Sequence, residues 1–159
     1  DGLTELPNRE AYDRRIAIEL ERSNRYGNTF CLVVLDVDRF KMINDTYGHL
    51  AGDKVLKLLA KTAKKRLRSS DYIARYGGEE FVILLPETDA GSALKLMNDI
   101  CSQVRNSPFH SQTKPLKITV SLGIAEVARD DSAEDLFSRA DKAMYHAKDM
   151  GRDQCQVAA

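Results

Sequence analysis

Two acidic segments carry the residue types most suited to chemistry. Glu79 and Glu80 directly follow Gly77-Gly78, and Asp36 ends a run of apolar residues. Carboxylates gathered at one place repel one another strongly, so such a cluster is reasonable only around a cation. Ligation by oxygen alone points to Mg²⁺ or Mn²⁺ and away from zinc. The two segments therefore predict a divalent metal site, provided that the fold brings them together.

The element that must hold the glutamates is a hairpin. Short β-prone runs flank Gly77-Gly78, which predicts a two-residue turn with positive φ at both glycines. Alternation along the second strand would send Glu79 and Glu80 to opposite faces of the sheet. Taken alone, an acidic pair at a turn is more typical of a solvated loop. The acids upstream change that balance in favour of a metal site.

The element that must hold Asp36 is a strand. Residues 29–36 form a continuous apolar run, which is typical of a central strand covered on both faces. Asp36 and Asp38 should point to the same side of it. If this strand lies beside the hairpin, Asp36 comes near the glutamates, and phosphate oxygens and water can complete the shell of the metal. The helix that follows offers free backbone N–H groups and Lys41 to a phosphate.

The remaining pattern places these elements in a fold class. We expect helices at 8–26, 39–47, 53–67, 89–104 and 132–148, a loop at 106–114, and strands at 118–127 and 154–157. A strand, helices, a hairpin, a helix and a strand form a split βαβ pattern. We therefore predict an α/β (α+β) fold with a ferredoxin-like, nucleotide-cyclase-like core. Its mixed, largely antiparallel sheet should have helices packed on both faces.

Length and composition limit the classes of function. The 159 residues fit a single domain, 1–159, with a sizeable core. The 24 basic and 24 acidic residues cancel, which gives no support to a nucleic-acid or membrane surface. The longest apolar run, 30–35, is too short to span a bilayer, and no signal-peptide pattern is present. Three scattered cysteines predict free thiols and a cytoplasmic protein.

Several long motifs resemble the GGDEF domain of diguanylate cyclases, in a Gly-Gly-Glu-Glu-Phe version at 77–81. Residues 1–9 resemble the opening motif of the family, although Glu5 stands where glycine is usual. Residues 36–53 resemble its metal- and base-binding segment, and residues 140–152 resemble its last helix. The resemblance covers essentially the whole chain in the right order, which is far more specific than the hairpin alone.

The resemblance implies that two GTP are condensed into cyclic di-GMP and two pyrophosphates across a homodimer of domains. The 3′-hydroxyl of each GTP would attack the α-phosphorus of the other. Two Mg²⁺ (or Mn²⁺) ions per active site are implied, with Asp36, Glu79, Glu80 and the carbonyl of Val37 as ligands. Glu79 is the implied proton acceptor, although the division of roles between the two glutamates stays open. Lys41 would stabilise the charge on the phosphate as the second catalytic residue.

The resemblance also implies a set of substrate-binding residues. They are Phe40, Asn44, His49, Asp53, Gly77, Gly78, Lys148 and Arg152. Asp53 can accept hydrogen bonds from the N–H donors of guanine. Adenine would present a lone pair to the Asp53 carboxylate instead, and this mismatch would lead to its rejection. The residues alone leave other interpretations open: Asn44 as a turn residue, Asp53 as a helix N-cap and His49 as a packing or hydrogen-bonding residue.

A second site is implied at Arg68-Ser-Ser-Asp71. It resembles the product-inhibition site of the family, where Arg68 and Asp71, with Arg22 from the first helix, would bind cyclic di-GMP. An arginine fork can contact guanine O6 and N7, or a phosphate, through two hydrogen bonds. Without the resemblance, an arginine at a helix end is more typically a partner of the helix dipole. A further arginine of the family falls on Asp99 here, which weakens the prediction.

Two hypotheses follow for the activity. The first is a Mg²⁺-dependent diguanylate cyclase, and the second is a GTP or cyclic di-GMP sensor without turnover. The motif residues present favour the enzyme: Asp36, Lys41, Asn44, Asp53, Gly77, Gly78, Glu79 and Glu80. The sequence begins within the opening motif, so we expect a domain excised from a longer signalling protein. An upstream sensory or receiver domain would then drive dimerisation.

Overall fold

The apolar run predicted as a strand forms β1 (Phe30–Val37), and every residue in it is buried. Four strands complete the sheet in the order β2-β3-β1-β6-β7; they are β2 (Tyr72–Arg75), β3 (Glu80–Pro86), β6 (Val120–Glu126) and β7 (Gln154–Val157). All pairs are antiparallel except β6 with β7. The first four positions reproduce the ferredoxin-like order, so the predicted fold class is confirmed.

The computed structural model describes residues 1–111 and 114–159, with the backbone alone described at 110, 111 and 114. Its helices are α1 (Arg9–Tyr26), α2 (Phe40–Tyr47), α3 (His49–Arg66), α4 (Ala90–Asn106) and α5 (Ala133–Asp149). Within the predicted loop, β4 (His110–Ser111) pairs with β5 (Lys114–Pro115). None of the helices in the described part of the chain is long and apolar enough to cross a membrane.

Helix capping explains where most of these helices begin. The Asn8 side chain accepts the Ala11 N–H at 2.9 Å, as predicted for α1. Ser132 caps α5 in a capping box with Asp135. The start of α3 was predicted wrongly: the helix begins at His49, after Gly48, and not at residue 53. The N-cap interpretation of Asp53 is therefore wrong, because this residue lies in the second turn.

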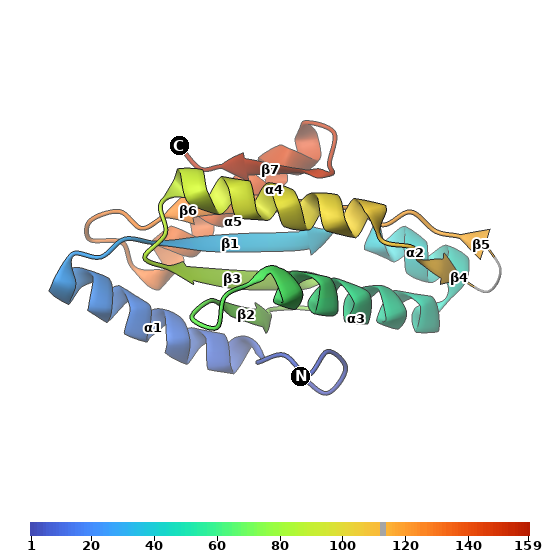
Figure 1. The fold of residues 1–159 in the computed structure, drawn as a ribbon, viewed down its shortest axis with the longest axis horizontal. Helices are drawn as coiled ribbons and strands as arrows, with labels where there is room; N and C mark the ends of the chain where they lie inside the picture. The colour runs from blue at the N-terminus through green and yellow to red at the C-terminus, as the bar shows by residue number, and fades with distance from the viewer. Residues whose placement is uncertain (112–113) are drawn as a thin grey trace.

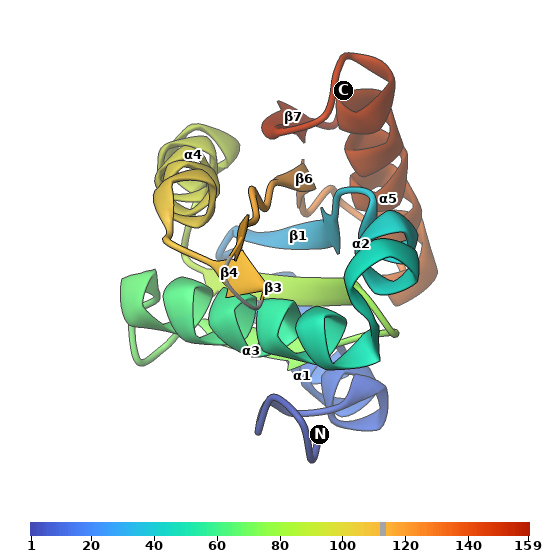
Figure 2. The ribbon, with the colours of Figure 1, turned by 90° about the vertical axis from the view of Figure 1, so that its right-hand side faces the viewer.

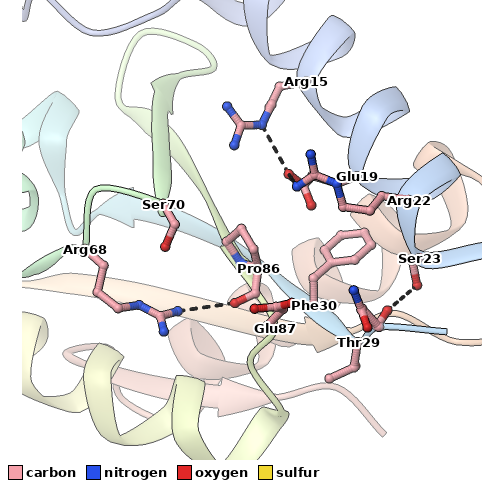
Figure 3. Close-up of a pocket in the computed structure, with 11 residues that line it drawn as sticks. Arg15, Glu19, Arg22, Ser23, Thr29, Phe30, Arg68, Ser70, Pro86 and Glu87 are labelled. Atoms are coloured by element: carbon pink, nitrogen blue, oxygen red, sulfur yellow. Dashed lines mark hydrogen bonds and ion pairs between the residues drawn. The ribbon is translucent and has the colours of Figure 1, made fainter. Parts of the chain in front are cut away.

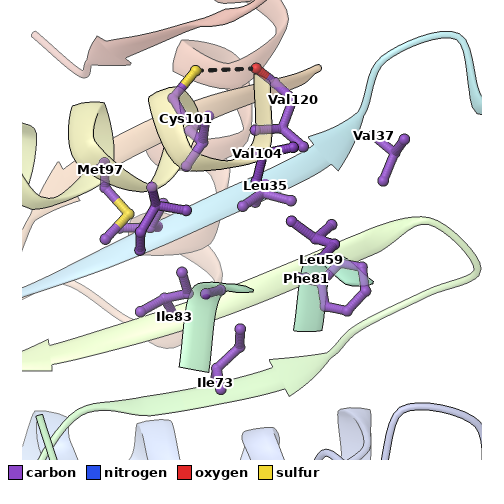
Figure 4. Packing of buried hydrophobic residues seen from close by; sticks show 14 of the residues in the cluster. Leu35, Val37, Leu59, Ile73, Phe81, Ile83, Met97, Cys101, Val104 and Val120 are labelled. Carbon is purple, nitrogen blue, oxygen red and sulfur yellow. Dashed lines mark hydrogen bonds between the residues drawn. The ribbon is translucent and has the colours of Figure 1, made fainter. Parts of the chain in front are cut away.

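Alternation along β1 divides the core between two faces of the sheet. Val33 and Leu35 pack under α3 and α4 in the larger cluster, which Figure 4 shows from close by. Leu32 and Val34 pack against α1 and α5 on the other face. Figures 1 and 2 show these helices covering the sheet from both sides. Asp36 continues the second set by alternation, which places its carboxylate on the face of α1 and α5.

Close packing fixes α5 on that face. A Cβ atom at Gly123 of β6 would lie 2.0 Å from the Ala140 carbonyl and 2.3 Å from the Met144 nitrogen. Only glycine allows the helix backbone to lie this near the strand. The last turn of α5, which carries Lys148, is thereby held beside the end of β1.

The hairpin between β2 and β3 differs from the predicted turn. Tyr76 and Gly77 both donate their N–H groups to the Glu80 carbonyl, at 2.8 and 3.2 Å. The turn is therefore longer than two residues, and neither Gly77 nor Gly78 has a positive φ. Glu79 belongs to this turn and not to the strand, so strand alternation does not govern the direction of its side chain.

Candidate active site

Four carboxylates gather where β1 ends, and we call them the carboxylate site: Asp36, Glu79, Glu80 and Asp141. Asp36 pairs directly with Glu80 in the register of β1 and β3. The charge of Asp36 raises the pKa of both glutamates and of Asp141 on α5, which places these groups near it. The predicted separation of the glutamates to opposite faces is therefore wrong. Asp141 was not among the residues predicted for this site, although it lies two helical turns before Lys148 on α5.

Burial and repulsion disfavour the charged forms of these acids. Burial raises the pKa of Asp36 above its ordinary value of 3.8, although Lys148 opposes that rise. Burial and the charge of Asp36 raise the pKa of Glu79, Glu80 and Asp141 in the same way. Lys148 Nζ lies 2.9 Å from Asp36 Oδ2 and is the cation that neutralises this site. One lysine against four acids leaves an excess of negative charge.

The donor atoms of the carboxylate site suit a hard divalent cation. Asp36 is only 6% exposed, and its Oδ1 atom is buried without a hydrogen-bond partner among the described residues. A buried carboxylate oxygen without a partner is costly, and a cation would satisfy it. Among the residues whose side chains the structure describes, no three His, Cys, Asp or Glu side chains lie close enough together to hold a metal ion by themselves. A metal held here by one or two carboxylates would complete its shell with water and phosphate oxygens, as Mg²⁺ does.

The start of α2 provides the predicted phosphate-binding groups. Arg39 caps the helix with a φ of 55°, and no side chain caps the free N–H groups. Lys41 is exposed in the first turn. The Phe40 side chain packs into the larger core cluster, so only its backbone can serve a phosphate. Val37 ends β1 and donates its N–H to the Glu79 carbonyl at 3.3 Å, which ties the hairpin to the strand.

The predicted base-binding residues lie on α2 and α3. Asn44 is within α2, and its Oδ1 atom is buried without a hydrogen-bond partner among the described residues. A Cβ atom at Gly52 would lie 1.9 Å from this oxygen, so glycine makes the room that the Asn44 side chain occupies. Asp53 is half-buried one residue further along. His49 is exposed and does not pack into the core, so of the interpretation as a packing or hydrogen-bonding residue only the second part stays open.

Two residues that the sequence analysis passed over hold the hairpin in place. Arg75 donates to the Gly77 carbonyl at 3.2 Å and to the Gly78 carbonyl at 2.7 Å. Its remaining nitrogen contacts both carboxylate oxygens of Asp1, at 3.1 and 3.2 Å. The first residue of the opening motif is thereby connected to the turn that carries Glu79. An arginine immediately before the turn was the available signal.

The second predicted site lies at the far end of α3. The helix ends at Arg66, so Arg68 lies one residue beyond its C-cap, Leu67. Arg68 pairs with Asp71 through two hydrogen bonds of 3.0 and 3.3 Å, and it also donates to Thr88. Figure 3 shows Arg22 and Arg68 on the wall of one pocket, which has a volume of about 200 Å³. Asp99, where the family has a further arginine, pairs with Arg66 at 3.5 Å.

A ferredoxin-like sheet with carboxylates, a lysine and a free helix start at the end of its central strand defines a nucleotide-cyclase-like class of protein. Residues 1–154 match the family model described as "Diguanylate cyclase, GGDEF domain". The chain therefore belongs to the GGDEF domain family.

Known proteins of this family are similar over nearly the whole chain. The diguanylate cyclase DgcP of Pseudomonas aeruginosa is 49% identical over 158 residues, which cover 99% of this chain and 24% of that protein. The GGDEF domain of DgcB from Caulobacter crescentus, solved with c-di-GMP, has a TM-score of 0.95 at 36% identity, covering 99% and 91% of the two chains. The active GGEEF domain of a Vibrio cholerae diguanylate cyclase has a TM-score of 0.91 at 31% identity, covering 98% and 99%. This chain spans between 22% and 38% of the first three curated relatives it matches.

Proposed function

We propose that the chain is the catalytic domain of a diguanylate cyclase, in the GGEEF version of the hairpin motif. The observation that carries the proposal is the buried Oδ1 atom of Asp36, which has no partner among the described residues and lies in a surplus of carboxylates. A cation bound together with a triphosphate would give this oxygen a partner and would supply positive charge to the site. The similarity to curated diguanylate cyclases at up to 49% identity supports this reaction.

Asp36, Glu79, Glu80 and the carbonyl of Val37 would hold the metal, as two Mg²⁺ or Mn²⁺ ions. When bound, these ions would polarise the α-phosphate and lower the pKa of the attacking hydroxyl. Lys148 would then leave Asp36 and turn to the triphosphate, because the metal takes over its neutralising role. Lys41 and Arg152 would add positive charge at the phosphates.

The reaction needs two copies of the site. The O3′ atom of one GTP would form a bond to the α-phosphorus of the other, and the bond from that phosphorus to the β-phosphate oxygen would break. Glu79 would take the proton from O3′, and pyrophosphate would leave. Repeating the step with the roles exchanged closes the ring. We therefore propose a homodimer in which two carboxylate sites face each other.

Base choice would depend on Asn44 and Asp53. The free Oδ1 atom of Asn44 and the Asp53 carboxylate would accept hydrogen bonds from the N–H donors of guanine. Adenine would leave these acceptors unpaired in a partly buried site, which is strongly rejected. His49 and the backbone of Phe40, Gly77 and Gly78 would line the remainder of the nucleotide site.

Regulation would come from outside the active site. Arg68, Asp71 and Arg22 would bind the product c-di-GMP; Arg22 and Arg68 line one pocket, which is shown in Figure 3. We place 1–159 as a single domain of a longer cytoplasmic protein, with an upstream sensory or receiver domain that brings two copies together. The greater length of the curated relatives supports a larger protein, and the three free cysteines suit a reducing compartment.

Formation of c-di-GMP from GTP and Mg²⁺ tests the proposal, for the wild type and Glu79→Gln over a range of protein concentrations. We expect product from the wild type, a loss of about 100-fold or more in Glu79→Gln, and a rate that rises faster than the first power of enzyme concentration. Glu21→Gln, an exposed change on α1, is the matched control. No product at any concentration, with c-di-GMP binding retained, would assign the domain to the sensors instead.

A further inference from the structure

Three consecutive residues after α5 adopt positive φ angles. They are Gly151 at 115°, Arg152 at 66° and Asp153 at 49°. Glycine tolerates this region, but two successive residues with side chains rarely adopt it. Such a conformation persists only where the surroundings hold it, and it concentrates at functional sites.

Backbone hydrogen bonds hold the segment at the base of the carboxylate site. The Arg152 N–H donates to the Ala147 carbonyl at 2.9 Å, and the Asp153 N–H donates to Asp38 Oδ2 at 3.0 Å. Asp38 is buried, and it also accepts from Thr119 at 2.8 Å and from Ser121 at 2.6 Å. Asp38 is thus fully satisfied by protein groups, unlike Asp36 two residues earlier, near the end of β1.

The Asp153 side chain extends this connection to α4. Arg105 Nε donates to Asp153 Oδ2 at 2.7 Å, and Cys101 donates its S–H to the other carboxylate oxygen at 3.5 Å. Both members of the Arg105–Asp153 ion pair are about two thirds buried. A partly buried, charge-assisted hydrogen bond of this length is a strong restraint on the segment.

Arg152 itself lacks such restraints. Its Nε atom is buried without a hydrogen-bond partner, and its guanidinium makes no ion pair within the described residues. The direction of this side chain is therefore set by the backbone of the segment and not by its own contacts. A guanidinium that is partly buried and has a free donor is ready to receive an anion.

We propose that Asp153 is a positioning residue for Arg152, and that Arg105 and Asp38 hold Asp153 in place. The proposal rests on the function given above, in which Arg152 binds a phosphate of GTP. The two acids at the end of β1 and just after it then have parallel tasks: Asp36 holds Lys148 directly, and Asp38 holds Arg152 through Asp153. The Arg105–Asp153 pair also connects α4 to the phosphate-binding end of the domain.

Binding of a GTP analogue with a methylene bridge between its α- and β-phosphates, measured by calorimetry with Mg²⁺, tests the proposal. Asp153→Asn keeps a residue that tolerates positive φ but removes the charge, and Arg105→Gln removes the partner. We expect each to weaken binding about tenfold, with Arg105→Lys restoring part of the loss. In an Arg152→Gln background, Asp153→Asn should cause no further loss, because its effect acts through Arg152.

Arg66→Gln is the control. It breaks the ion pair between Arg66 of α3 and Asp99, which lies on α4 as Arg105 does, and it leaves residues 151–153 unchanged. It should bind the analogue as the wild type does. An equal loss from Asp153→Asn with and without Arg152 would overturn the positioning role, and so would unchanged binding in Arg105→Gln and Asp153→Asn. A wild type that binds the analogue but forms no c-di-GMP would contradict the proposed function alone.

Discussion

The carboxylate site and the Arg68–Asp71 site differ in how their polar atoms are satisfied. In the carboxylate site, Asp36 Oδ1 has no partner among the described residues and the carboxyl pKa values are raised. In the second site, Arg68 already donates to Asp71, Pro86 and Thr88. The first site gains partners when a ligand binds, whereas a ligand of the second must compete with hydrogen bonds that exist. A ligand would therefore add a missing partner at Asp36 Oδ1, whereas at Arg68 it would replace partners that are already present.

The largest effect is expected from displacing the Asn44 side chain, whose Oδ1 atom, like that of Asp36, is buried without a partner among the described residues. In Gly52→Ala the new Cβ would lie 1.9 Å from Asn44 Oδ1, so that side chain must leave its position. We expect GTP affinity to fall by about 100-fold and the preference for GTP over ATP to be largely lost. Calorimetry with the methylene analogues of both nucleotides checks this.

Gly91→Ala serves as the control for Gly52→Ala. It adds the same methyl group at the start of α4, where the nearest atom is 3.6 Å away. Nucleotide preference should be unchanged there. If Gly52→Ala kept the guanine preference of the wild type, Asn44 would not be the residue that selects the base.

The second prediction concerns the charge of the carboxylate site. Its carboxyl pKa values are raised by folding, so the folded state binds more protons than the unfolded state does. These groups therefore lower the free energy of unfolding as pH rises above their ordinary values of 3.8 and 4.5 towards their raised ones. The decrease in the free energy of unfolding should be largest near neutral pH in EDTA, and Mg²⁺ should reverse this decrease.

Glu80→Gln isolates this effect. It should raise the melting temperature in EDTA by about 4 °C at pH 7 and by less at pH 4, because one repelling charge is removed. Adding Mg²⁺ should reduce the difference in melting temperature between Glu80→Gln and the wild type. Glu21→Gln, on the exposed face of α1, should show no such dependence. A Glu80→Gln variant less stable than the wild type in EDTA at pH 7 would show that repulsion is not the dominant feature of the site.

The third prediction addresses the satisfied site. Arg68→Ala should weaken binding of c-di-GMP by about tenfold, which calorimetry without GTP can measure. The loss is limited because the wild-type arginine must first release its bonds to Asp71. Arg14→Ala, an exposed arginine of α1, should bind c-di-GMP as the wild type does. Unchanged affinity in Arg68→Ala would place the product site elsewhere.

The smallest expected effect concerns Glu5, where the family usually has glycine. Glu5 has a φ of 62°, a conformation that costs a side-chain residue more than glycine. Glu5→Gly should raise the free energy of unfolding by about 0.5 kcal/mol, after the greater flexibility of glycine in the unfolded chain is subtracted. In a urea titration, the free energy of unfolding of Glu5→Asn should lie between those of the wild type and Glu5→Gly. A destabilised Glu5→Gly would contradict this explanation.

The sequence predicted features that local patterns determine. The apolar run at 29–36, the caps at Asn8 and Ser132 and the order of the elements were sufficient for the ferredoxin-like fold. The prediction of a two-residue turn at Gly77-Gly78 was wrong, because Arg75 donates to both turn carbonyls and is itself held by Asp1, which is distant in sequence. Such long-range side-chain contacts leave no periodic pattern in the sequence.

The candidate site was predicted unevenly for the same reason. Asp36 and the glutamates were found because their types and positions are unusual for strand ends. Asp141 was missed because an acid on an amphipathic helix resembles any solvated residue. Asp38 and Asp153 were not distinguished from ligands or loop residues, since only the fold shows that one holds the other.

Binding of the methylene-bridged GTP analogue to the wild type and to Asp36→Asn, measured in Mg²⁺ and in EDTA, shows whether the carboxylate site requires a divalent cation and a nucleotide together. We predict binding in Mg²⁺ at least about tenfold tighter than in EDTA for the wild type, and no such difference in Asp36→Asn. Equal affinity of the wild type in Mg²⁺ and in EDTA would contradict this requirement.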